Sequence, residues 1–378
     1  MHILIVSSYH GGSHQAWAEG YARHSSHQVE CLSLPARFWK WRMHGGAVTL
    51  ARRFLAGLES GDITAPDLFL FTDMVDMTTF LALVRRTCPI DPAVLYMHEN
   101  QLTYPLPETT ETGPMRRQKG ERDLHYAFVN FVSMLSADRI YFNSEFHRQE
   151  LFVELPKFLQ HFPEHKELQS IPALETRSKV LPVGVEFARL GTRPEKVIPG
   201  QPPLIIWNQR WEYDKNPGQF FSALITLARE GHPFRLAVCG ENYAREPSEL
   251  DAAYEQLADR IVHWGYASQP DYAQLLWQAT ATASTAFHEF FGISVVESMY
   301  CETYAVLPDR LSYPELVPAE MHQDCLYGSD SELVQKLRWA IDNPESAWET
   351  GRRLAQSAVR FDWRRLAAVY DSEFERLR

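Results

Sequence analysis

The sequence predicts an α/β protein made of two doubly wound domains in tandem, and three observations support this prediction. Short apolar runs alternate with amphipathic stretches along most of the 378 residues, as in parallel strands that are connected by helices. The alternation stops between Leu190 and Pro203, where four prolines and two glycines occur, and then starts again. We therefore expect an N-terminal domain at 1–190, a linker at 191–203 and a C-terminal domain at 204–360.

The first half contains five short apolar runs that are typical of buried parallel strands. These predicted strands cover residues 2–9, 28–34, 67–72, 93–98 and 139–143. Amphipathic stretches between them predict helices at 47–59, 77–86 and 122–136. The first strand lies close to the N-terminus and lacks the basic and long apolar segments of a signal peptide, so no secretory leader is expected.

The second half repeats this pattern. Its predicted strands cover residues 204–208, 234–240, 261–265, 280–286 and 304–308, and a helix is expected from Pro217. The last segment, 361–378, predicts a helix that carries four apolar residues on one face: Leu366, Val369, Tyr370 and Phe374. Ligands of doubly wound sheets bind beyond the carboxyl ends of the strands, so we expect the site residues in the loops that follow each strand.

Composition narrows the class of protein. Hydrophobic residues make up 45% and charged residues 22% of the chain, which is typical of a globular protein. No apolar run approaches the 18 residues of a membrane span. Five scattered cysteines without metal-binding spacing favour a reducing, cytoplasmic environment. The net charge of −11 means that the protein surface as a whole does not indicate nucleic-acid binding.

The stretch from Phe287 to Cys301 carries the strongest functional signal, because two carboxylates, Glu289 and Glu297, bracket a predicted helix start. The free backbone N–H groups of a helix that begins near Gly292 and Ile293 favour a bound anion. Eight helical residues span about 12 Å, which suits the two ends of an elongated, phosphate-containing ligand better than one glycosidic bond. The alternative is a core helix start whose glutamates point into solvent.

Two adjacent aromatic residues, Phe290 and Phe291, lie between these carboxylates, and we expect them to form an apolar wall for the ligand. A glycine at position 292 lets a ligand approach the backbone closely. After the strand at 261–265, Tyr266 is a candidate for packing on a nucleobase. The alternative for Tyr266 is an aromatic residue at the edge of the core.

The loop after the first strand of the second domain contains Arg210 and Lys215, five positions apart. A planar guanidinium and a mobile ammonium on one strand-to-helix loop can both reach the same diphosphate. The alternative is a pair of surface charges neutralised by Glu212 and Asp214. If they bind a leaving diphosphate, we expect alanine at either position to lower the rate with only small effects on folding.

In the first domain, polar residues follow two of the predicted strands. Gly11 and Gly12 precede Ser13 and His14, where backbone can approach a pyrophosphate or an acceptor, although an ordinary turn is the alternative. After the strand at 93–98, the end residue His98 is followed by three further polar residues: Glu99, Asn100 and Gln101. Such side chains are costly to bury without partners, so we expect a ligand site or a satisfied structural network there.

Two basic clusters stand out against the acidic chain. One is acid-free between Cys31 and Leu58 and interleaves Trp39 and Trp41 with five basic residues: Arg37, Lys40, Arg42, Arg52 and Arg53. The second contains Arg116, Arg117, Lys119 and Arg122. Basic residues beside aromatic faces are expected where unstacked RNA bases bind. The alternative is a solvated basic helix with tryptophans in the core.

The motif Glu-Phe-Phe-Gly-Ile-Ser-Val-Val-Glu at 289–297 resembles the Glu-x7-Glu signature of retaining nucleotide-sugar glycosyltransferases with the GT-B fold. That resemblance implies two Rossmann-like domains that face each other across a cleft. Further motifs resemble the tRNA-queuosine α-mannosyltransferase family, which moves mannose from GDP-mannose to queuosine in tRNA-Asp. These motifs begin at Tyr9 (Y-x-G-G-S-H), Leu34 (L-P-A-R-F-W-K-W-R), His98 (H-E-N-Q-L-T-Y-P), Glu121 (E-R-D-L-H-Y) and Asn208 (N-Q-R-W-E-Y-D-K-N-P).

The resemblance assigns expected roles. It implies that Glu289 holds sugar hydroxyls, that Glu297 holds the donor ribose, and that the pair formed by Arg210 and Lys215 neutralises the leaving diphosphate. His98 would face the developing oxocarbenium sugar, and the last helix would cross back onto the first domain. The chain contains no Asp-x-Asp motif, the usual carrier of a metal–diphosphate complex in the other glycosyltransferase fold, so we expect no metal or other cofactor.

Two alternative functions remain open at this level. One is a GT-B glycosyltransferase with a small-molecule or lipid acceptor. The other is a catalytically silent RNA-binding protein on the same scaffold. The presence of all four residue types at positions 210, 215, 289 and 297 argues against the silent protein, because drift without catalysis need not retain them.

Overall fold

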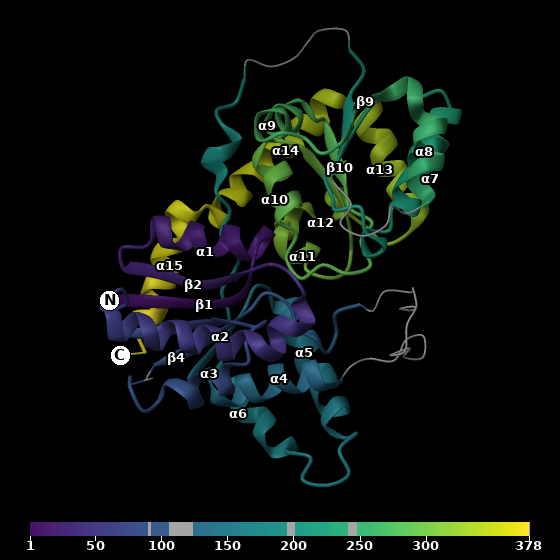
Figure 1. The fold of residues 1–378 in the computed structure, drawn as a ribbon. Helices are drawn as coiled ribbons and strands as arrows, with labels where there is room; N and C mark the ends of the chain where they lie inside the picture. The colour runs from purple at the N-terminus through teal and green to yellow at the C-terminus, as the bar shows by residue number, and fades with distance from the viewer. Residues whose placement is uncertain (90–91, 106–123, 195–200, 241–247, 378) are drawn as a thin grey trace. The chain divides into compact units, whose positions relative to one another are not determined.

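The computed structural model describes residues 1–89, 92–105, 124–194, 201–240 and 248–377. The chain forms two compact units, each with its own sheet (Figure 1). The first unit combines Met1–Gly184 with Trp363–Arg378, and the second is Val185–Asp362. The C-terminal segment therefore belongs to the same unit as the N-terminal domain.

The division between the units lies before the linker predicted at 191–203. The backbone N–H of Val185 donates to the carbonyl of Phe361 at 2.7 Å, and Trp277 Nε1 donates to the carbonyl of Leu190 at 2.8 Å. These bonds attach residues 185–190 to the second unit. The observed boundary differs from the predicted one because proline and glycine content reports local irregularity, whereas a unit boundary depends on tertiary contacts.

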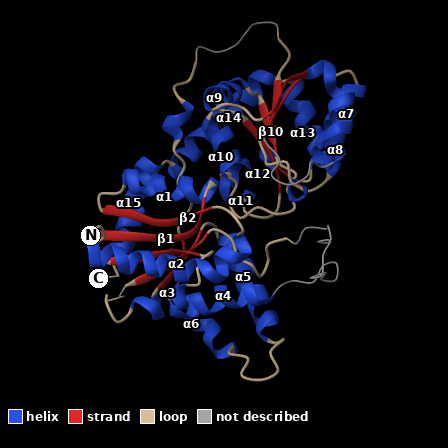
Figure 2. Cartoon of the chain, in the orientation of Figure 1, coloured by secondary structure: helices blue, strands red, loops and turns tan. Residues whose placement is uncertain are grey.

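The first unit is built on a parallel sheet with strand order β2-β1-β3-β4-β5-β6. Its strands are red in Figure 2, where β1 and β2 are labelled. Its strands are β1 His2–His10, β2 Gln28–Pro35, β3 Leu68–Thr72, β4 Ala93–Met97, β5 Arg139–Phe142 and β6 Ser178–Val180. The five predicted strands are confirmed to within two residues at each end. The three-residue strand β6 was missed because it is too short to carry a periodic pattern.

The helices of the first unit connect and flank these strands. They are α1 Gly12–His24, α2 Trp39–Ser60, α3 Met77–Val84, α4 Leu124–Ser136, α5 Glu145–Leu159, α6 Ile171–Arg177 and α15 Trp363–Glu375. Helix α2 begins well before the predicted residue 47, because Gly45 and Gly46 do not break it. A Cβ at Gly46 would lie 2.7 Å from Ser8 Cβ, so this glycine lets the helix pack tightly on β1.

The two faces of the first sheet bury different side chains. Helices α2, α3 and α4 cover a face whose core contains the aromatic residues Phe54, Phe69, Phe71 and Phe80. Helices α1 and α15 lie side by side (Figure 1). The core beneath them contains larger rings with polar tips: Trp17, Tyr21, Tyr96, Trp363 and Tyr370.

Helix α15 is attached to α1 by a buried hydrogen-bond network. Trp17 Nε1 donates to the Tyr370 hydroxyl at 3.0 Å, and the Tyr21 hydroxyl donates to Asp371 Oδ1 at 2.9 Å. Trp363 is fully buried against Gly20 and Gly184. Three of the four residues predicted on the buried face of this helix are buried, but Val369 is exposed. Val369 lies on the solvent-facing side of α15, outside the narrow seam that contacts α1.

The second unit contains a parallel sheet of order β12-β11-β10-β7-β8-β9. Its strands are β7 Leu204–Trp207, β8 Arg235–Cys239, β9 Ile261–Gly265, β10 Ala281–Ala283, β11 Tyr304–Pro308 and β12 Leu326–Tyr327. Its helices are α7 Pro217–Arg229, α8 Ser248–Leu257, α9 Gln269–Gln278, α10 Ile293–Tyr300, α11 Tyr313–Leu316, α12 His322–Cys325, α13 Asp330–Asp342 and α14 Pro344–Ala358. The strand expected at 280–286 is shorter, because the chain turns away after Ala283.

The strand order of each sheet determines where a ligand can bind beyond the ends of its strands. In the first sheet, successive strands are added on one side of β1 and then on the other, so the strand order reverses between β1 and β3. In the second sheet the strand order reverses in the same way between β7 and β10. Connections leave such a switch point toward opposite faces, which opens a crevice beyond the carboxyl ends of the two strands. The loop after β7 and the segment from β10 to α10 meet at this point of the second unit, and both carry predicted site residues.

Candidate active site

The centre of the site in the second unit is a buried ion pair between Lys215 and Glu289. Lys215 is only 5% exposed, and its Nζ lies 3.2 Å from Glu289 Oε2 and 3.1 Å from Asp214 Oδ2. The ammonium also donates to the carbonyl of His288 at 3.1 Å. The Lys215 ammonium thus has two hydrogen-bond acceptors, His288 and Glu289, and a further ion-pair partner in Asp214, so it holds the Glu289 carboxylate in position.

Burial and the charges of this ion pair shift the pKa values of Lys215, Glu289 and the neighbouring His288. Burial alone would lower the pKa of Lys215, but the carboxylates of Glu289 and Asp214 more than offset it and raise that pKa. Burial likewise opposes ionisation of Glu289, yet Lys215 and the backbone N–H of Phe291 hold the pKa of this carboxyl below its usual value. Burial and the charge of Lys215 lower the pKa of His288 to about 4. At neutral pH the site contains a charged pair beside a neutral imidazole.

Hydrogen bonds to backbone carbonyls hold the segments of this site together. Thr285 Oγ1 donates to the carbonyls of Lys215 and Asn216 at 3.0 and 2.9 Å, and the Phe287 N–H donates to the Asp214 carbonyl at 2.7 Å. Ser312 Oγ donates to the Glu289 carbonyl at 3.2 Å. The positions of Lys215 and Glu289 are therefore fixed before any ligand arrives.

Helix α10 begins where the sequence predicts. Gly292 has a φ of 100°, in the left-handed region that other residues rarely adopt, and it precedes Ile293, the first helical residue. The N-cap makes no side-chain hydrogen bond to the N–H groups of the first turn. An anion is the partner that such a helix start favours.

The predicted apolar wall is wrong. Both phenyl rings lie in the core: Phe290 packs edge-on against His288 at 4.3 Å between ring centroids, and Phe291 against Phe361 at 5.3 Å. Two adjacent aromatic residues in a polar loop fit either a ligand wall or two core anchors, and only the fold distinguishes them. At positions 290 and 291, what remains available to a ligand is the backbone.

Glu297 points into the second unit rather than into solvent. It is buried on α10, with Oε1 paired to Arg189 and Oε2 accepting from the Tyr272 hydroxyl at 2.7 Å. Asn208 Nδ2, directly after β7, donates to the same Tyr272 hydroxyl at 3.0 Å. The solvent-facing alternative for the glutamates is therefore wrong.

Two other predicted residues of the second unit lie at the surface. Arg210 is half exposed and pairs with Glu212 Oε1 at 3.3 Å, and its charge acts electrostatically on Lys215 and His288. Unlike Lys215, it can extend directly to an anion. Tyr266 is 71% exposed beyond β9, which excludes the core-edge alternative and leaves its ring available for stacking.

In the first unit, the peptide of His98 is held on both sides. Its N–H donates to Asp73 Oδ1 at 2.9 Å, and its carbonyl accepts from Asn143 Nδ2 at 2.8 Å. The imidazole is enclosed by the rings of His14 and Trp17, with centroids 4.2 and 4.7 Å away. Burial and the neighbouring histidines lower the pKa of His98 well below its usual value. A neutral imidazole can lie beside a developing positive charge without repelling it.

Asp73 was not predicted and follows β3 at the switch point of the first sheet. It is buried, and burial together with the nearby Glu99 carboxylate raises its pKa well above the usual range. Its backbone carbonyl accepts from Asn130 Nδ2 at 2.9 Å, and Asn130 Oδ1 accepts from the Gln101 N–H at 2.9 Å. The polar residues after β3 and β4 therefore form one network.

The remaining candidates of the first unit have local roles or lie at its surface. Asn100 Oδ1 accepts from the backbone N–H groups of Leu102 and Thr103, so its side chain closes a turn. Gln101 Nε2 donates to Glu99 Oε1 at 2.8 Å. The structural alternative is thus observed for Asn100 and for part of Gln101. Three further residues, at the start of α1, lie beside β1; Gly12 and Ser13 are exposed and His14 is buried.

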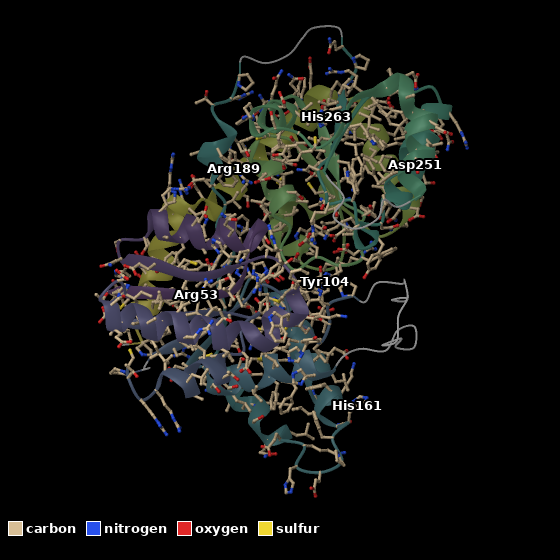
Figure 3. The ribbon with its side chains drawn as sticks, in the orientation of Figure 1. Arg53, Tyr104, His161, Arg189, Asp251 and His263 are labelled. Carbon is tan, nitrogen blue, oxygen red and sulfur yellow. The ribbon has the colours of Figure 1, made fainter. Side chains whose placement is uncertain are left out.

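The first basic cluster lies on and before α2, and we use the name α2 patch for residues Arg37 to Trp41 together with Arg52 and Arg53. Trp41 is 65% exposed and Phe38 is exposed as well, so the alternative with core tryptophans is wrong. The Lys40 ammonium lies 5.8 Å from the Trp39 ring centroid. Farther along the helix are two exposed arginines, Arg52 and Arg53, the second labelled in Figure 3.

The second basic cluster, with Arg116 and Arg117, lies outside the described residues. Within the described ranges, no group of three or more His, Cys, Asp or Glu residues is placed to hold a metal ion. In the same part of the chain, no helix combines the length and apolar character that crossing a membrane requires.

Comparisons with known proteins identify the family. A family model for the tRNA-queuosine α-mannosyltransferase N-terminal region matches residues 2–185, and one for glycosyl transferases group 1 matches residues 190–358. The chain is 30% identical over 344 residues to the tRNA-queuosine α-mannosyltransferase of Drosophila melanogaster, covering 89% of this chain and 86% of the relative. The chain belongs to the tRNA-queuosine α-mannosyltransferase family. It is a glycosyltransferase.

More distant relatives of this family member match only part of their length. A GDP-mannose:cellobiosyl-diphosphopolyprenol α-mannosyltransferase of Xanthomonas oryzae is 25% identical over 207 residues, or 53% of each chain. Among solved structures, sucrose-phosphate synthase from Thermosynechococcus elongatus matches with a TM-score of 0.71 at 12% identity, covering 100% of this chain and 99% of that one. Anabaena HepE in complex with UDP matches with a TM-score of 0.67 at 15% sequence identity, covering 100% of both chains. The fold of this member of the tRNA-queuosine α-mannosyltransferase family is GT-B.

Sequence reasoning missed several residues of the two sites. Asp73 follows a buried strand, as His98 does, and this position could have identified it. Arg189 and Tyr272 carry no comparable signal, because they come from a short turn and from a helix far from Glu297 in the sequence.

Proposed function

We propose that this protein transfers mannose from GDP-mannose to the queuosine nucleoside of tRNA-Asp in the cytoplasm, with retention of anomeric configuration and without a metal ion. The family supports the reaction class and the type of acceptor. GDP-mannose is named in the descriptions of two partial relatives, from Xanthomonas oryzae and Mycobacterium tuberculosis. The observation that carries the donor half is the buried Lys215–Glu289 pair beside the start of α10, at the switch point of the second sheet.

The proposed chemistry follows from the charges in the second unit. The acceptor hydroxyl attacks the anomeric carbon, the bond from this carbon to the phosphate oxygen breaks, and the departing phosphate takes the proton. Arg210, the charge of Lys215 and the N–H groups after Gly292 stabilise the negative charge that grows on GDP. Glu289, ionised and held by Lys215, accepts hydrogen bonds from mannose hydroxyls. Glu297 binds the ribose, and Tyr266 packs on the base.

The acceptor is proposed to bind the first unit. The α2 patch combines exposed aromatic rings with basic side chains, which is the chemistry that binds unstacked RNA bases and their phosphates. An RNA that approaches a protein with a net charge of −11 needs such a local cationic surface to offset the long-range repulsion. A lipid or small-molecule acceptor would not depend on this patch in a salt-dependent manner.

A transfer assay tests the proposal. Radiolabelled mannose from GDP-mannose should enter tRNA that contains queuosine and should not enter the same tRNA with guanosine at that position. UDP-glucose is the control donor. Incorporation that does not depend on queuosine, or transfer only to lipid extracts, would overturn the proposed acceptor.

A tRNA titration at several salt concentrations tests the binding surface. Phosphate contacts make the logarithm of affinity fall with that of salt concentration, with a slope of about 0.7 to 0.9 per phosphate neutralised. A variant with alanine at both Arg52 and Arg53 should flatten this slope, and Trp41→Ala should weaken tRNA binding with an unchanged slope. Neither variant should alter GDP-mannose binding. Identical affinity and slope in all three proteins would remove the surface of α2 from the acceptor site.

A further inference from the structure

Both oxygens of the buried Glu297 carboxylate are occupied by side chains of the second unit. Arg189 pairs with Oε1 and the Tyr272 hydroxyl donates to Oε2 at 2.7 Å. The Glu297 side chain is only 4% exposed. A carboxylate so deeply buried is stable only while donors surround it, so the empty site needs these partners.

The two donors differ in their freedom to leave. Tyr272 is held in place, because Asn208 Nδ2 donates to its hydroxyl at 3.0 Å. The Arg189 side chain is 38% exposed and borders solvent. Figure 3 labels it on the segment that opens the second unit.

The backbone around Arg189 is anchored independently of its guanidinium. The neighbouring Phe187 ring stacks on Tyr300 of α10 with centroids 4.0 Å apart, and the Leu190 carbonyl accepts from Trp277 Nε1. Gln269 Nε2 donates to the carbonyl of Arg189 itself at 3.1 Å. The guanidinium can therefore swing into solvent while this turn stays in position.

We propose that Arg189 is a positioning residue of the donor site, which holds the Glu297 carboxylate when the site is empty and is exchanged for the ribose hydroxyls of the nucleotide. This inference rests on the proposed function, in which Glu297 binds the ribose. A vicinal diol brings two O–H donors to a carboxylate, enough to replace the guanidinium on Oε1. The nucleotide then binds against a competing internal ion pair.

The competition gives a measurable signature. In Arg189→Ala, nothing competes with the ribose, so GDP should bind at least about fivefold more tightly than to the parent, a typical coupling between two linked interactions. The analogue 2′,3′-dideoxy-GDP cannot replace the guanidinium, so its affinity should not increase. Calorimetric titration of both ligands into both proteins measures the coupling. An arginine that simply supported the fold would change both affinities alike.

A matched control and a second variant accompany this experiment. Arg193 lies in the same segment and pairs with Glu302 at 3.0 Å, so Arg193→Ala removes a comparable ion pair and should leave both affinities unchanged. If Arg189→Ala does not fold, Arg189→Lys keeps the charge but loses the planar fork, and should show a smaller gain for GDP alone.

The outcomes separate this inference from the proposed function. Equal weakening of GDP and its dideoxy analogue in Arg189→Ala, or no change in either, would overturn the exchange. The same titrations with UDP and its dideoxy analogue test the exchange without reference to the base, because the ribose is common to both. Binding of UDP without GDP would therefore refute the proposed donor and leave the exchange standing. A parent protein that binds neither nucleotide would overturn both.

Discussion

At the scale of single residues, Lys215 and Arg210 are predicted to fail in different ways. Lys215 is buried between two carboxylates, so Lys215→Met leaves both unpaired and should lower the free energy of unfolding by about 3 to 5 kcal/mol. The half-exposed pair of Arg210 with Glu212 contributes about 0 to 1 kcal/mol. We therefore expect a small effect on folding for Arg210 but not for Lys215.

The kinetic effect of Arg210 should nevertheless be large. Removal of one donor to a developing anion costs about 100-fold or more in rate. We expect this loss in kcat for Arg210→Ala, measured by single-turnover mannosyl transfer, with an unfolding midpoint in urea close to that of the parent. A normal kcat in this variant would remove Arg210 from the diphosphate site.

The neutral His288 predicts acid sensitivity. Its folded pKa is about 4 and its unfolded value about 6.5, so below pH 6.5 the unfolded chain binds a proton that the folded protein does not. Stability should be lost as pH falls from 6.5 toward 4, by about 3 kcal/mol at pH 4 from this residue. Urea unfolding of His288→Gln across this range should show a correspondingly smaller loss. The exposed His161→Gln is the control and should follow the parent curve.

At the scale of elements, the contact between α1 and α15 is a tight fit. A Cβ on Gly20 would lie 2.0 Å from Trp363 Nε1, and no flexible side-chain end is available to move aside. We expect Gly20→Ala to lower the free energy of unfolding by about 1 to 3 kcal/mol. Gly328→Ala is the matched control, since its nearest neighbour would be Glu332 Oε2 at 3.7 Å.

The smaller ring in Trp363→Phe should restore part of the stability lost in Gly20→Ala. Limited proteolysis should also release α15 earlier from the glycine variant than from the parent. If the two glycine variants were equally stable, the packing of α15 on α1 would not be the limiting contact.

At the scale of the whole molecule, the proposed reaction should survive chelation. Charge on the leaving GDP is assigned to Arg210, Lys215 and the backbone N–H groups after Gly292, so no divalent cation is needed. Mannosyl transfer should retain nearly its full rate in excess EDTA, after a wash of both enzyme and donor through chelating resin. Loss of activity in EDTA that magnesium or manganese restores would contradict this mechanism.

Much of this protein follows from its sequence. The apolar runs predicted both parallel sheets, because a strand that is buried on both faces must be continuously apolar. The start of α10 was also predictable, since Gly292 can adopt a positive φ without a steric cost. The position of site residues after β4, β7 and β10 follows from the general rule for ligands at strand ends.

Other features depend on contacts between residues that are distant in the chain. The aromatic pair Phe290 and Phe291 suits a ligand wall or a core equally well, and only packing against His288 and Phe361 decides between them. The division at Gly184 depends on bonds from Val185 to Phe361, which no local pattern encodes.

The sequence by itself determined the two sheets, the family motifs and the residue types of the donor site, because these depend on hydrophobic periodicity and local backbone preference. Only the tertiary structure decided how those residues are charged and held. Burial of Lys215 beside Glu289 sets their ionisation, and the pairing of Arg189 with Glu297 joins a short turn to a helix more than 100 residues away. Both depend on desolvation and on partners that the fold brings together, and neither quantity is local in sequence.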